Sequence, residues 1–313
     1  MYDTVNFCLS IADVGEVDFL QETPCFLESE SLGFHDWGGQ RVVTGKVGGL
    51  KVVANRYQIK VKDGSLCKYY LGNNFKAMGR KDTQRAIERL SDTLHLPMSK
   101  ATVTRIDVAQ NIIVKHPVKV YLNHLGVLNY ATRLQEPTGL YYCKQMERLC
   151  FYDKNREQKT KGEEIPELYK ERNVLRYEQR YIKRLPVAFG VENVTGALLY
   201  DEAFYIDLLN RWRDDYKAIQ KINDVQLNFD CMRNKKDLNR MGLLSLVERV
   251  GGLNAMMNQI TEAQQQGKLN RKQAFDLRQA IKEACAVKDG LVVENEAIAE
   301  LSKKVVEAVR FYR

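Results

Sequence analysis

The first strand predicted by the pattern of apolar residues lies at the start of the chain. Every second residue there is apolar, namely Val5, Phe7, Leu9 and Ile11. A period of two is typical of a β-strand with one buried face. A short helix is expected next, over residues 14–22, and Pro24 ends it because proline cannot continue a helix.

Three antiparallel strands are expected to follow this helix. The pairs Gly48-Gly49 and Asp63-Gly64 suit two-residue turns, since such turns need backbone angles that glycine adopts easily. The runs on either side of these turns are rich in apolar and β-branched residues. They are expected as strands at residues 41–47, 50–62 and 65–71.

Helices and strands then mix through the middle of the chain. Ile87, Leu90 and Leu94 repeat at helical spacing, which predicts a helix over residues 82–96. Further elements are expected as a helix over 117–128 and as strands at 102–114, 141–144, 148–153 and 174–181. Antiparallel groups of strands with single helices between them indicate an α+β fold, an antiparallel sheet with flanking helices.

The pattern becomes helical from about residue 195 onward. The expected helices cover residues 198–212, 241–260, 270–285 and 294–312, with Gly251-Gly252 as a potential break in the second. Residues 215–235 contain few regularly spaced apolar positions, which is typical of a domain boundary. We therefore predict a sheet-containing domain over residues 1–215 and an all-helical C-terminal domain over residues 216–313.

Composition and charge describe a folded protein with a modest basic excess. The 313 residues include 48 Lys and Arg against 40 Asp and Glu, a net charge of +8, which makes nucleic acid the first partner to test. Seven cysteines without a C-x-x-C pair fit reduced thiols in the cytoplasm. No apolar run reaches the roughly 18 residues of a membrane span, and the start of the chain lacks a secretory signal. A cytoplasmic protein without a membrane partner is expected.

Several common catalytic motifs are missing from the sequence. The four histidines stand alone and form no H-x-H or H-E-x-x-H pair, which argues against zinc proteases and excludes the histidine clamp of many DNA-nicking enzymes. No P-loop and no G-x-G-x-x-G occurs, so ATP and dinucleotides have no sequence support. The candidate chemistry lies in three segments that combine carboxylates, arginines and a tyrosine.

The first segment is the centre of the strand expected at residues 102–114. Alternation places Arg105, Asp107 and Asn111 on one face of this strand, opposite Ile106 and Val108. Charged groups in the middle of a strand must be paired or coordinated. Asp107 is therefore either a ligand in a polar site or one half of an ion pair with Arg105 on a solvated face.

The second segment is the strand expected at residues 174–181. Arg176, Glu178 and Arg180 share one of its faces. A carboxylate suits Mg²⁺ or Mn²⁺, and arginines suit phosphate, so this face is typical of an anion site with a hard cation. A ladder of charges between neighbouring strands is the structural alternative.

The third segment ends the hairpin strand at residues 148–153. Arg148 and Tyr152 share a face there, and Lys154 and Arg156 follow. A phenol has a pKa near 10 and becomes a useful nucleophile only beside a cation, a metal or a base. Lys154 and Arg156 are placed to supply such a field. The alternative is a tyrosine packed at the edge of the sheet.

These segments in this order resemble a family of replication initiators. The motifs that carry the resemblance are T-R-I-D-V-A, Y-Y-x-x-K…R-L-x-F-Y-D-K-x-x-E, L-R-Y-E-x-R, Tyr2-Asp3-Thr4-Val5 and K-Y-Y-L-G-N-N over residues 68–74. Together they are similar to the gene II/X replication proteins of filamentous phages and plasmids. The staphylococcal rolling-circle plasmid initiators share three of these motifs. The resemblance covers about residues 1–215, and more loosely the helical region after residue 240.

The resemblance implies a rolling-circle initiator, which nicks one DNA strand with a tyrosine, forms a 5′-phosphotyrosine and frees a 3′-OH. The nucleophile of the family falls on Tyr152, and its metal ligands fall on Asp107 and Glu178. The expected cofactor is a divalent metal, Mg²⁺ or Mn²⁺. Lys154 and Arg176 would stabilise charge on the phosphoryl oxygens or favour the phenolate.

One departure from the family concerns the metal shell. Several relatives carry a second acid four residues after the first, whereas this chain has Asn111, an oxygen donor without charge. Water or another acid, such as Glu157, would then complete the shell. If a Tyr152 variant still formed an adduct, Tyr141 or Tyr142 would be the nucleophile.

DNA is the expected partner, either single-stranded or as a supercoiled duplex origin. The residues expected to contact it are Arg105, Arg148, Arg156, Lys159 and Arg180. The C-terminal helices are expected to bind DNA or to form a homodimer. Two other functions stay open, a non-catalytic DNA-binding regulator of the same family and an unrelated α+β protein whose charged strands are ion-pair ladders.

Overall fold

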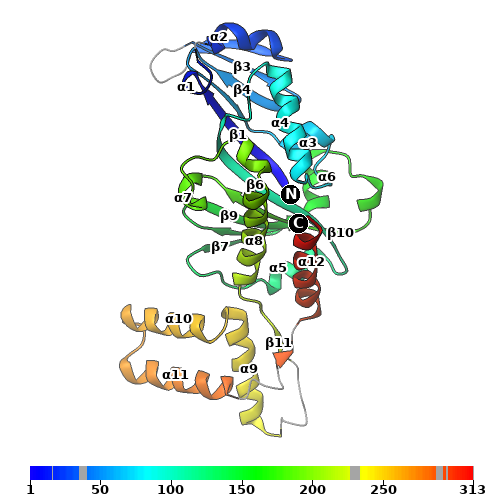
Figure 1. Cartoon of the computed structure of the whole chain (residues 1–313). Coiled ribbons are helices and arrows are strands. Elements are labelled where there is room, and N and C mark those ends of the chain that lie inside the picture. The colour runs from blue at the N-terminus through cyan, green and yellow to red at the C-terminus, as the bar shows by residue number, and fades with distance from the viewer. Residues whose placement is uncertain (16, 35–40, 226–232, 287–291, 294, 313) are drawn as a thin grey trace.

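One antiparallel sheet of ten strands organises the described part of the chain (Figure 1). The structure is a computed structural model that describes the chain apart from residues 16, 35–40, 226–232, 287–291, 294 and 313. The strands are β1 (Tyr2–Ser10), β2 (Glu30–Phe34), β3 (Arg41–Val47), β4 (Leu50–Ala54), β5 (Gln58–Lys62), β6 (Thr102–Val114), β7 (Thr132–Glu136), β8 (Gly139–Cys143), β9 (Glu147–Asp153) and β10 (Asn173–Tyr181). Their order is β2-β3-β4-β5-β1-β6-β10-β9-β8-β7, which places β6 and β10 side by side near the centre.

Helices connect and cover the sheet. The first eight are α1 (Ile11–Val14), α2 (Phe19–Glu22), α3 (Leu66–Leu71), α4 (Arg80–Leu94), α5 (Val118–His124), α6 (Lys154–Lys161), α7 (Leu185–Phe189) and α8 (Glu202–Ala218). Three short 3-10 helices lie at Thr23–Phe26, Glu167–Tyr169 and Ala197–Tyr200. The predicted fold class, an antiparallel α+β sheet followed by helices, is confirmed.

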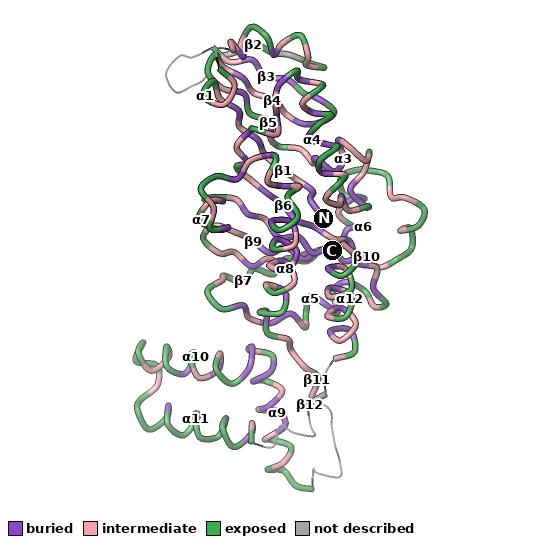
Figure 2. The backbone as a smooth tube through the Cα atoms, viewed as in Figure 1, coloured by how far each residue is buried: buried purple, intermediate pink, exposed green. Residues whose placement is uncertain are grey.

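An aromatic stack joins the sheet to α8. Tyr177 of β10 lies between Phe151 of β9 and Trp212 of α8, with ring-centroid distances of 4.4 Å and 4.5 Å. The Tyr177 hydroxyl also donates to the carbonyl oxygen of Trp212 at 2.9 Å. All three side chains are fully buried, and the buried strands form the centre of the molecule in Figure 2. Because side chains alternate along a strand, the neighbours of Tyr177 point to the opposite face of the sheet.

The remaining helices divide into two groups. The C-terminal elements are β11 (Asp224–Val225), α9 (Lys235–Val250), α10 (Leu253–Gln265), α11 (Arg271–Cys285), β12 (Val292–Val293) and α12 (Glu296–Tyr312). Helices α9–α11 pack on one another around Val247, Met256 and Ile281, in a small apolar cluster of their own. We call these three helices the α9–α11 module.

Helix α12 packs on the sheet rather than on the α9–α11 module. Ile298, Leu301 and Val305 are buried in the main core, and α12 contacts α5, α8 and β6. The Tyr216 hydroxyl of α8 also lies 3.0 Å from the Ser302 hydroxyl of α12. The domain boundary predicted at residue 215 assigned α12 to the C-terminal domain. In the structure, the apolar side of α12 packs into the core of the sheet-containing domain.

Other expected elements differ from the structure in identifiable ways. Residues 65–71, expected as a strand, form α3, because the Ser65 side chain caps the helix at the Lys68 amide and Gly72 ends it with φ of 78°. The strand expected over residues 50–62 is divided into β4 and β5, since the Asn55 side chain accepts from the amides of two following residues and turns the chain.

Two other expected helices are also interrupted. In place of the helix expected over residues 14–22, α1 ends at Val14, before Gly15 with φ of 87°, and α2 begins only at Phe19. The break considered at Gly251-Gly252 is confirmed, because both glycines have positive φ and separate α9 from α10. No described helix is long and apolar enough to cross a membrane.

Candidate active site

The three candidate segments meet on adjacent strands of the sheet, on the face opposite the aromatic stack. The register of β10 with its neighbours pairs Arg180 with Asp107, Glu178 with Ala109, and Arg176 with both Asn111 and Tyr152. Side chains directly opposite in neighbouring strands lie within contact distance. Strand pairing therefore brings the predicted nucleophile and both predicted metal ligands to one place.

These residues open onto a polar cleft of about 760 Å³. Its acidic lining residues are Asp3, Asp63, Asp107, Asp153, Glu157, Glu163 and Glu178, and its basic lining residues are Lys68, Arg105, Lys154, Arg156, Lys161 and Arg180. Tyr141 and Tyr152 line the same cleft. The cleft therefore mixes ligands suited to a cation with donors suited to phosphate.

Glu178 is a buried carboxylate that contacts two arginines and the predicted nucleophile. It accepts from Arg180 Nε at 2.7 Å, from Arg176 Nε at 3.3 Å and from the Tyr152 hydroxyl at 3.0 Å. Burial alone would raise its pKa, but the two arginines outweigh burial and hold the pKa at about 2. Glu178 is therefore ionised, and it is a weak base that orients the Tyr152 hydroxyl.

Asp107 is a buried carboxylate whose pKa is raised, in contrast to that of Glu178. The Arg105 guanidinium donates to both of its oxygens, at 2.9 Å and 2.6 Å, so the ion pair expected as the structural alternative exists. Burial and the nearby charge of Glu178 still raise the pKa of Asp107 to about 7, against the opposing effect of Arg105. Additional positive charge at this point would stabilise the ionised form.

Tyr152 is held as a neutral phenol. Burial raises its pKa well above 10; Arg176 opposes this effect, and the charge of Glu178 adds to it. Its hydroxyl is already hydrogen-bonded to an ionised carboxylate, which favours the protonated form. Formation of the phenolate therefore requires positive charge beyond what the described side chains supply.

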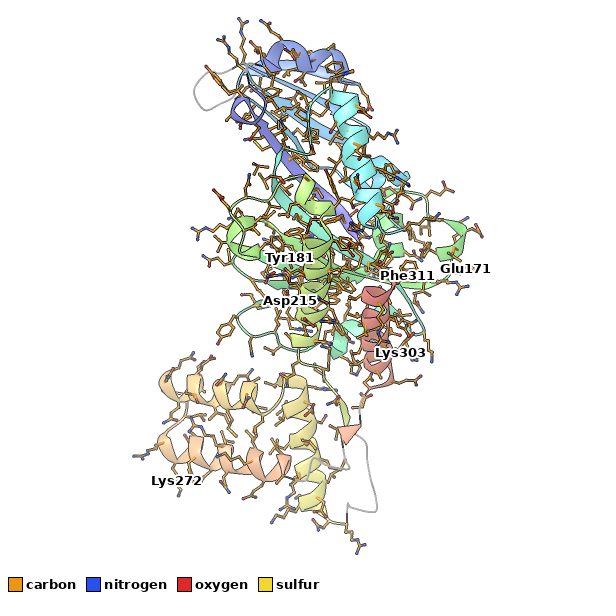
Figure 3. All side chains as sticks on the ribbon, in the orientation of Figure 1. Glu171, Tyr181, Asp215, Lys272, Lys303 and Phe311 are labelled. Atoms are coloured by element: carbon orange, nitrogen blue, oxygen red, sulfur yellow. The ribbon has the colours of Figure 1, made fainter. Side chains whose placement is uncertain are left out.

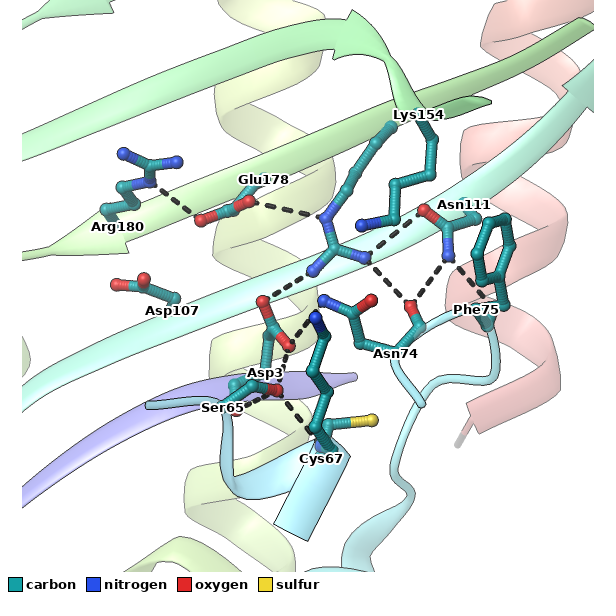
Figure 4. A network of polar contacts seen from close by, with 12 residues as sticks. Asp3, Ser65, Cys67, Asn74, Phe75, Asp107, Asn111, Lys154, Glu178 and Arg180 are labelled. Carbon is teal, nitrogen blue, oxygen red and sulfur yellow. Dashed lines mark hydrogen bonds and ion pairs between the residues drawn. The ribbon is translucent and has the colours of Figure 1, made fainter. Parts of the chain in front are cut away.

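Arg176 lies beneath the cleft rather than on its surface. Only 2% of this residue is exposed, and its guanidinium donates to Asp3 Oδ2 at 2.6 Å and to Asn111 Oδ1 at 3.2 Å. It also donates to the carbonyl oxygen of Asn74 and to Glu178. Its partners Asp3, Asn74, Asn111 and Glu178 are labelled in Figure 4. The sequence predicted that Arg176 stabilises charge on the phosphoryl oxygens or favours the phenolate. Its buried position suits the second role: it orients the carboxylates, and its charge opposes the rise in the pKa of Tyr152.

Asp3 is a site residue that the sequence reasoning assigned no role. A register shift in β1 places two residues, Asp3 and Thr4, opposite the single residue Asp107 of β6. Such a bulge re-aims side chains, and here it directs Asp3 into the cleft and onto Arg176. The acid stands in a motif that carried the resemblance, but strand alternation alone gives no signal of the bulge.

Helix α6 carries the basic residues that follow Tyr152. Lys154 is buried at 1% exposure, and its Nζ donates to Glu157 Oε2 at 2.8 Å and lies 5.6 Å from the centre of the Phe75 ring. Burial lowers the pKa of Lys154, and the charge of Arg176 adds to this effect. Arg156 is exposed and lines the cleft, so α6 presents one buried and one accessible cation.

Two of the other four predicted DNA contacts line the cleft, and two do not. Arg105 and Arg180 line the cleft. Arg148 and Lys159 are exposed but lie outside its lining. A further cation that the prediction omitted, Lys68, lines the cleft and donates to Glu163 Oε1 at 2.7 Å.

The N-cap residue of α6 is expected to stabilise this helix and thereby to hold Lys154 and Arg156 in position. The Asp153 side chain accepts from the Arg156 amide at 3.0 Å, so Asp153→Ala should lower the free energy of unfolding by about 1 kcal/mol. Urea denaturation monitored by circular dichroism measures this change. Glu164→Ala, at an exposed position nearby, is the control and should leave stability unchanged. Equal denaturation midpoints for the two variants would contradict the capping role.

Two tyrosines stand as alternatives to Tyr152. The Tyr142 hydroxyl is buried and donates to the carbonyl oxygen of Gly126 at 2.7 Å, on the other side of the sheet from the cleft. Tyr141 lines the cleft, and its ring occupies the space where a side chain at residue 139 would lie. Gly139 is paired with Tyr152, so Tyr141 is the alternative nucleophile that the geometry retains.

The donor chemistry of the cleft fits a divalent cation held by two carboxylates. Asp107 and Glu178 face the cleft from neighbouring strands, and Mg²⁺ is commonly bound through one or two carboxylates, with water and phosphate oxygens completing the shell. Within the described ranges, no group of three acidic, histidine or cysteine side chains converges on one point. Arg105 and Arg180 would have to turn away from the carboxylates.

The two other oxygen donors considered for the metal shell are engaged elsewhere. The Asn111 amide donates to the carbonyl oxygens of Asn74 and Phe75, and its oxygen accepts from Arg176. Glu157 forms ion pairs with Lys154 and Lys161. Asn111 is buried in these contacts, so water or phosphate oxygens are better suited to complete the shell.

Comparison with known protein families agrees with the site. The family described as the N-terminal region of the phage gene II replication-associated protein matches residues 1–199, which include the sheet and the whole cleft. The chain belongs to this family of replication proteins, and the resemblance to the filamentous-phage gene II initiators is thereby confirmed. No curated protein matches the chain significantly.

Proposed function

We propose that this replication protein nicks and rejoins one strand of DNA through Tyr152. The observation that carries the proposal is the Tyr152 hydroxyl, hydrogen-bonded to Glu178 in a cleft that also holds Asp107 and several cations. In the proposed step, the phenolic oxygen attacks a phosphodiester phosphorus. A bond forms between the phosphorus and Tyr152 as the phenolic proton passes to solvent. The P–O3′ bond breaks, and the departing oxygen takes one proton from solvent to become a 3′-OH.

Three side chains of the cleft have separate roles in this proposed step. Glu178 accepts the hydrogen bond of the phenol and fixes the direction of its oxygen. Arg156, exposed at the edge of the cleft, is placed to bind the phosphate backbone of the incoming strand. Lys154 contributes positive charge from within the wall of the cleft. Rejoining reverses the step and needs no ATP, because the phosphotyrosine ester retains the energy of the bond.

A divalent metal is part of the proposal. Asp107 and Glu178 would hold Mg²⁺ or Mn²⁺, which when bound supplies positive charge at the scissile phosphate and favours the phenolate. The positive charge would lower the raised pKa values of Asp107 and Tyr152 and so favour their ionised forms.

Manganese binding provides a direct test of the metal site. Asp107→Asn is expected to weaken Mn²⁺ binding by about tenfold or more, because it removes one of two charged ligands. Since a protonated carboxyl binds metal poorly and the pKa of Asp107 is raised to about 7, the affinity of the unaltered protein should fall as pH decreases through about 7. Electron paramagnetic resonance of free Mn²⁺ measures both effects.

Asp63→Asn is the matched control for this titration, since Asp63 also lines the cleft but is exposed, after the end of β5. It should leave Mn²⁺ affinity unchanged. Equal losses in the two variants, or an affinity independent of pH, would contradict a site on Asp107.

Covalent capture tests the proposed activity as a whole. The protein is incubated with Mn²⁺ or Mg²⁺ and a library of single-stranded DNA of random sequence, then denatured, and the DNA that stays attached is sequenced. A DNA-linked peptide containing Tyr152, identified by mass spectrometry, would support the proposal. DNA binding without any covalent product would instead support a non-catalytic replication regulator.

A further inference from the structure

The α9–α11 module carries a large share of the basic excess of the protein. Residues 235–285 contain nine Lys and Arg against five Asp and Glu, a net charge of +4 out of the +8 of the whole chain. These residues lie outside the cleft and outside the region matched by the family. The charge of the module therefore requires an explanation separate from the cleft.

The basic residues of α11 are gathered on one face. Ala274, Ile281 and Ala284 are buried against the rest of the module, so the opposite side of the helix faces solvent. That side carries the exposed residues Arg271, Lys272, Phe275, Gln279 and Lys282, which we call the α11 face; the exposed acids Asp276 and Glu283 lie along one edge of it. Successive members stand one to four residues apart, so all lie within about a third of the helix circumference. In Figure 3 the side chain of Lys272 points outward from the module.

The cations of the α11 face are available to a ligand. Arg271, Lys272 and Lys282 form no ion pair with another residue in the part of the chain that the structure describes. By contrast, Lys304 of α12 is paired with Glu300 at 2.7 Å. An array of unpaired cations on a rigid element is suited to a polyanion.

The module is held beside the sheet domain by a paired entry and exit. Strands β11 and β12 are antiparallel, so the segments that lead into and out of the module run together. At this point Asp224 accepts from Asn295 at 2.5 Å and lies 3.2 Å from His124 of α5. The module is therefore anchored at one end of the molecule, with α11 projecting from it (Figure 1).

We propose that the α11 face binds duplex DNA and forms a second DNA contact, separate from the cleft. Helix α11 has 15 residues, a length of roughly 22 Å, and a helix of this kind fits the major groove of B-form DNA. Arg271, Lys272 and Lys282 contact phosphates, and Gln279, whose amide nitrogen donates to Glu283 at 3.4 Å, offers its amide oxygen to base edges. Phe275, which is 64% exposed, lies among the cations, where its ring contacts thymine methyl groups or sugars.

The inference extends the proposed function, since it takes DNA as the partner, but it does not require Tyr152 chemistry. The test compares the triple variant Arg271→Ala, Lys272→Ala, Lys282→Ala with the unaltered full-length chain. Fluorescence anisotropy measures binding to a duplex of about 30 base pairs over a range of salt concentrations. We expect duplex affinity to fall about tenfold or more, and the slope of log affinity against log salt to decrease by up to about 2.7, which is about 0.9 for each lost phosphate contact.

A matched control removes three cations from another surface. Lys60→Ala, Lys81→Ala, Arg85→Ala changes the net charge equally, and these residues are exposed on β5 and α4. The control should retain both the affinity and the salt slope. Capture of short single-stranded DNA should be the same for the triple variant, the control and the unaltered protein, because the cleft is unchanged. If no protein captured DNA covalently but the triple variant still lost duplex affinity, the nicking proposal would be overturned and the inference about the α11 face would stand.

Two results would overturn the inference. One is a duplex affinity that falls equally in the triple variant and its control, since the effect would then follow net charge alone. The other is a change in oligomeric state by sedimentation, without a change in DNA affinity, which would make the α11 face an interface between copies of the chain. All three substituted residues are exposed, so circular dichroism is expected to show an intact fold for both variants.

Discussion

Tyr152→Phe is expected to abolish the covalent protein–DNA product while DNA binding survives. The substitution removes the only atom that forms the proposed bond to phosphorus, so the rate of covalent capture should fall by at least about a thousandfold. The fold should tolerate the change, because Glu178 keeps both of its arginine partners. The lost hydrogen bond should lower the free energy of unfolding by at most about 1–2 kcal/mol.

Tyr141→Phe is the matched control for this experiment. Tyr141 lines the same cleft, so its loss tests whether any tyrosine near the DNA affects the yield. Capture should persist in this variant, with the DNA still attached to the Tyr152 peptide. An adduct that survives Tyr152→Phe and maps to Tyr141 would transfer the role of nucleophile to the neighbouring strand β8.

Arg176→Met is expected to destabilise the protein more than any other single change at the site. The guanidinium is buried between Asp3 and Glu178, so its removal leaves two buried carboxylates without their common partner. Loss of one partner from a buried ion pair lowers stability by about 3–5 kcal/mol, even where the side-chain volume is nearly conserved. Urea denaturation of the purified protein measures the change.

Two comparisons distinguish burial of charge from loss of side-chain volume. Arg148→Met changes an exposed arginine and should alter stability by no more than about 0.5 kcal/mol. Asp3→Asn introduced into the Arg176→Met variant should restore part of the loss, because it neutralises the acid that loses its ion pair, whereas Glu178 keeps Arg180. A loss below about 1 kcal/mol in Arg176→Met would show that the buried network contributes little.

The role of Arg176 changes how activity data on this site should be read. A residue that touches the phosphate affects the reaction without affecting the fold. Arg176 instead holds Asp3 and Glu178, so its variants should lose activity together with stability. Measurements on Arg176 variants therefore need the fraction of folded protein before any catalytic role is assigned.

Local sequence patterns predicted most of the sheet and the faces of its central strands. Alternation along β6 and β10 placed Asp107 and Glu178 opposite the apolar core, and both lie there. The same reasoning was wrong for residues 65–71, which have apolar residues suited to a strand. There the hydrogen bond from the Lys68 amide to Ser65 starts a helix, and such capping outweighed β propensity.

The sequence by itself determined which side chains share a face, because the periods of strands and helices depend on residues close together in the chain. Only the tertiary structure decided the register that brings Tyr152 beside Glu178, the bulge that adds Asp3 to the cleft, and the return of α12 to the main core. These features depend on pairing between strands and packing between helices far apart in the sequence, and no local pattern encodes a partner at that distance.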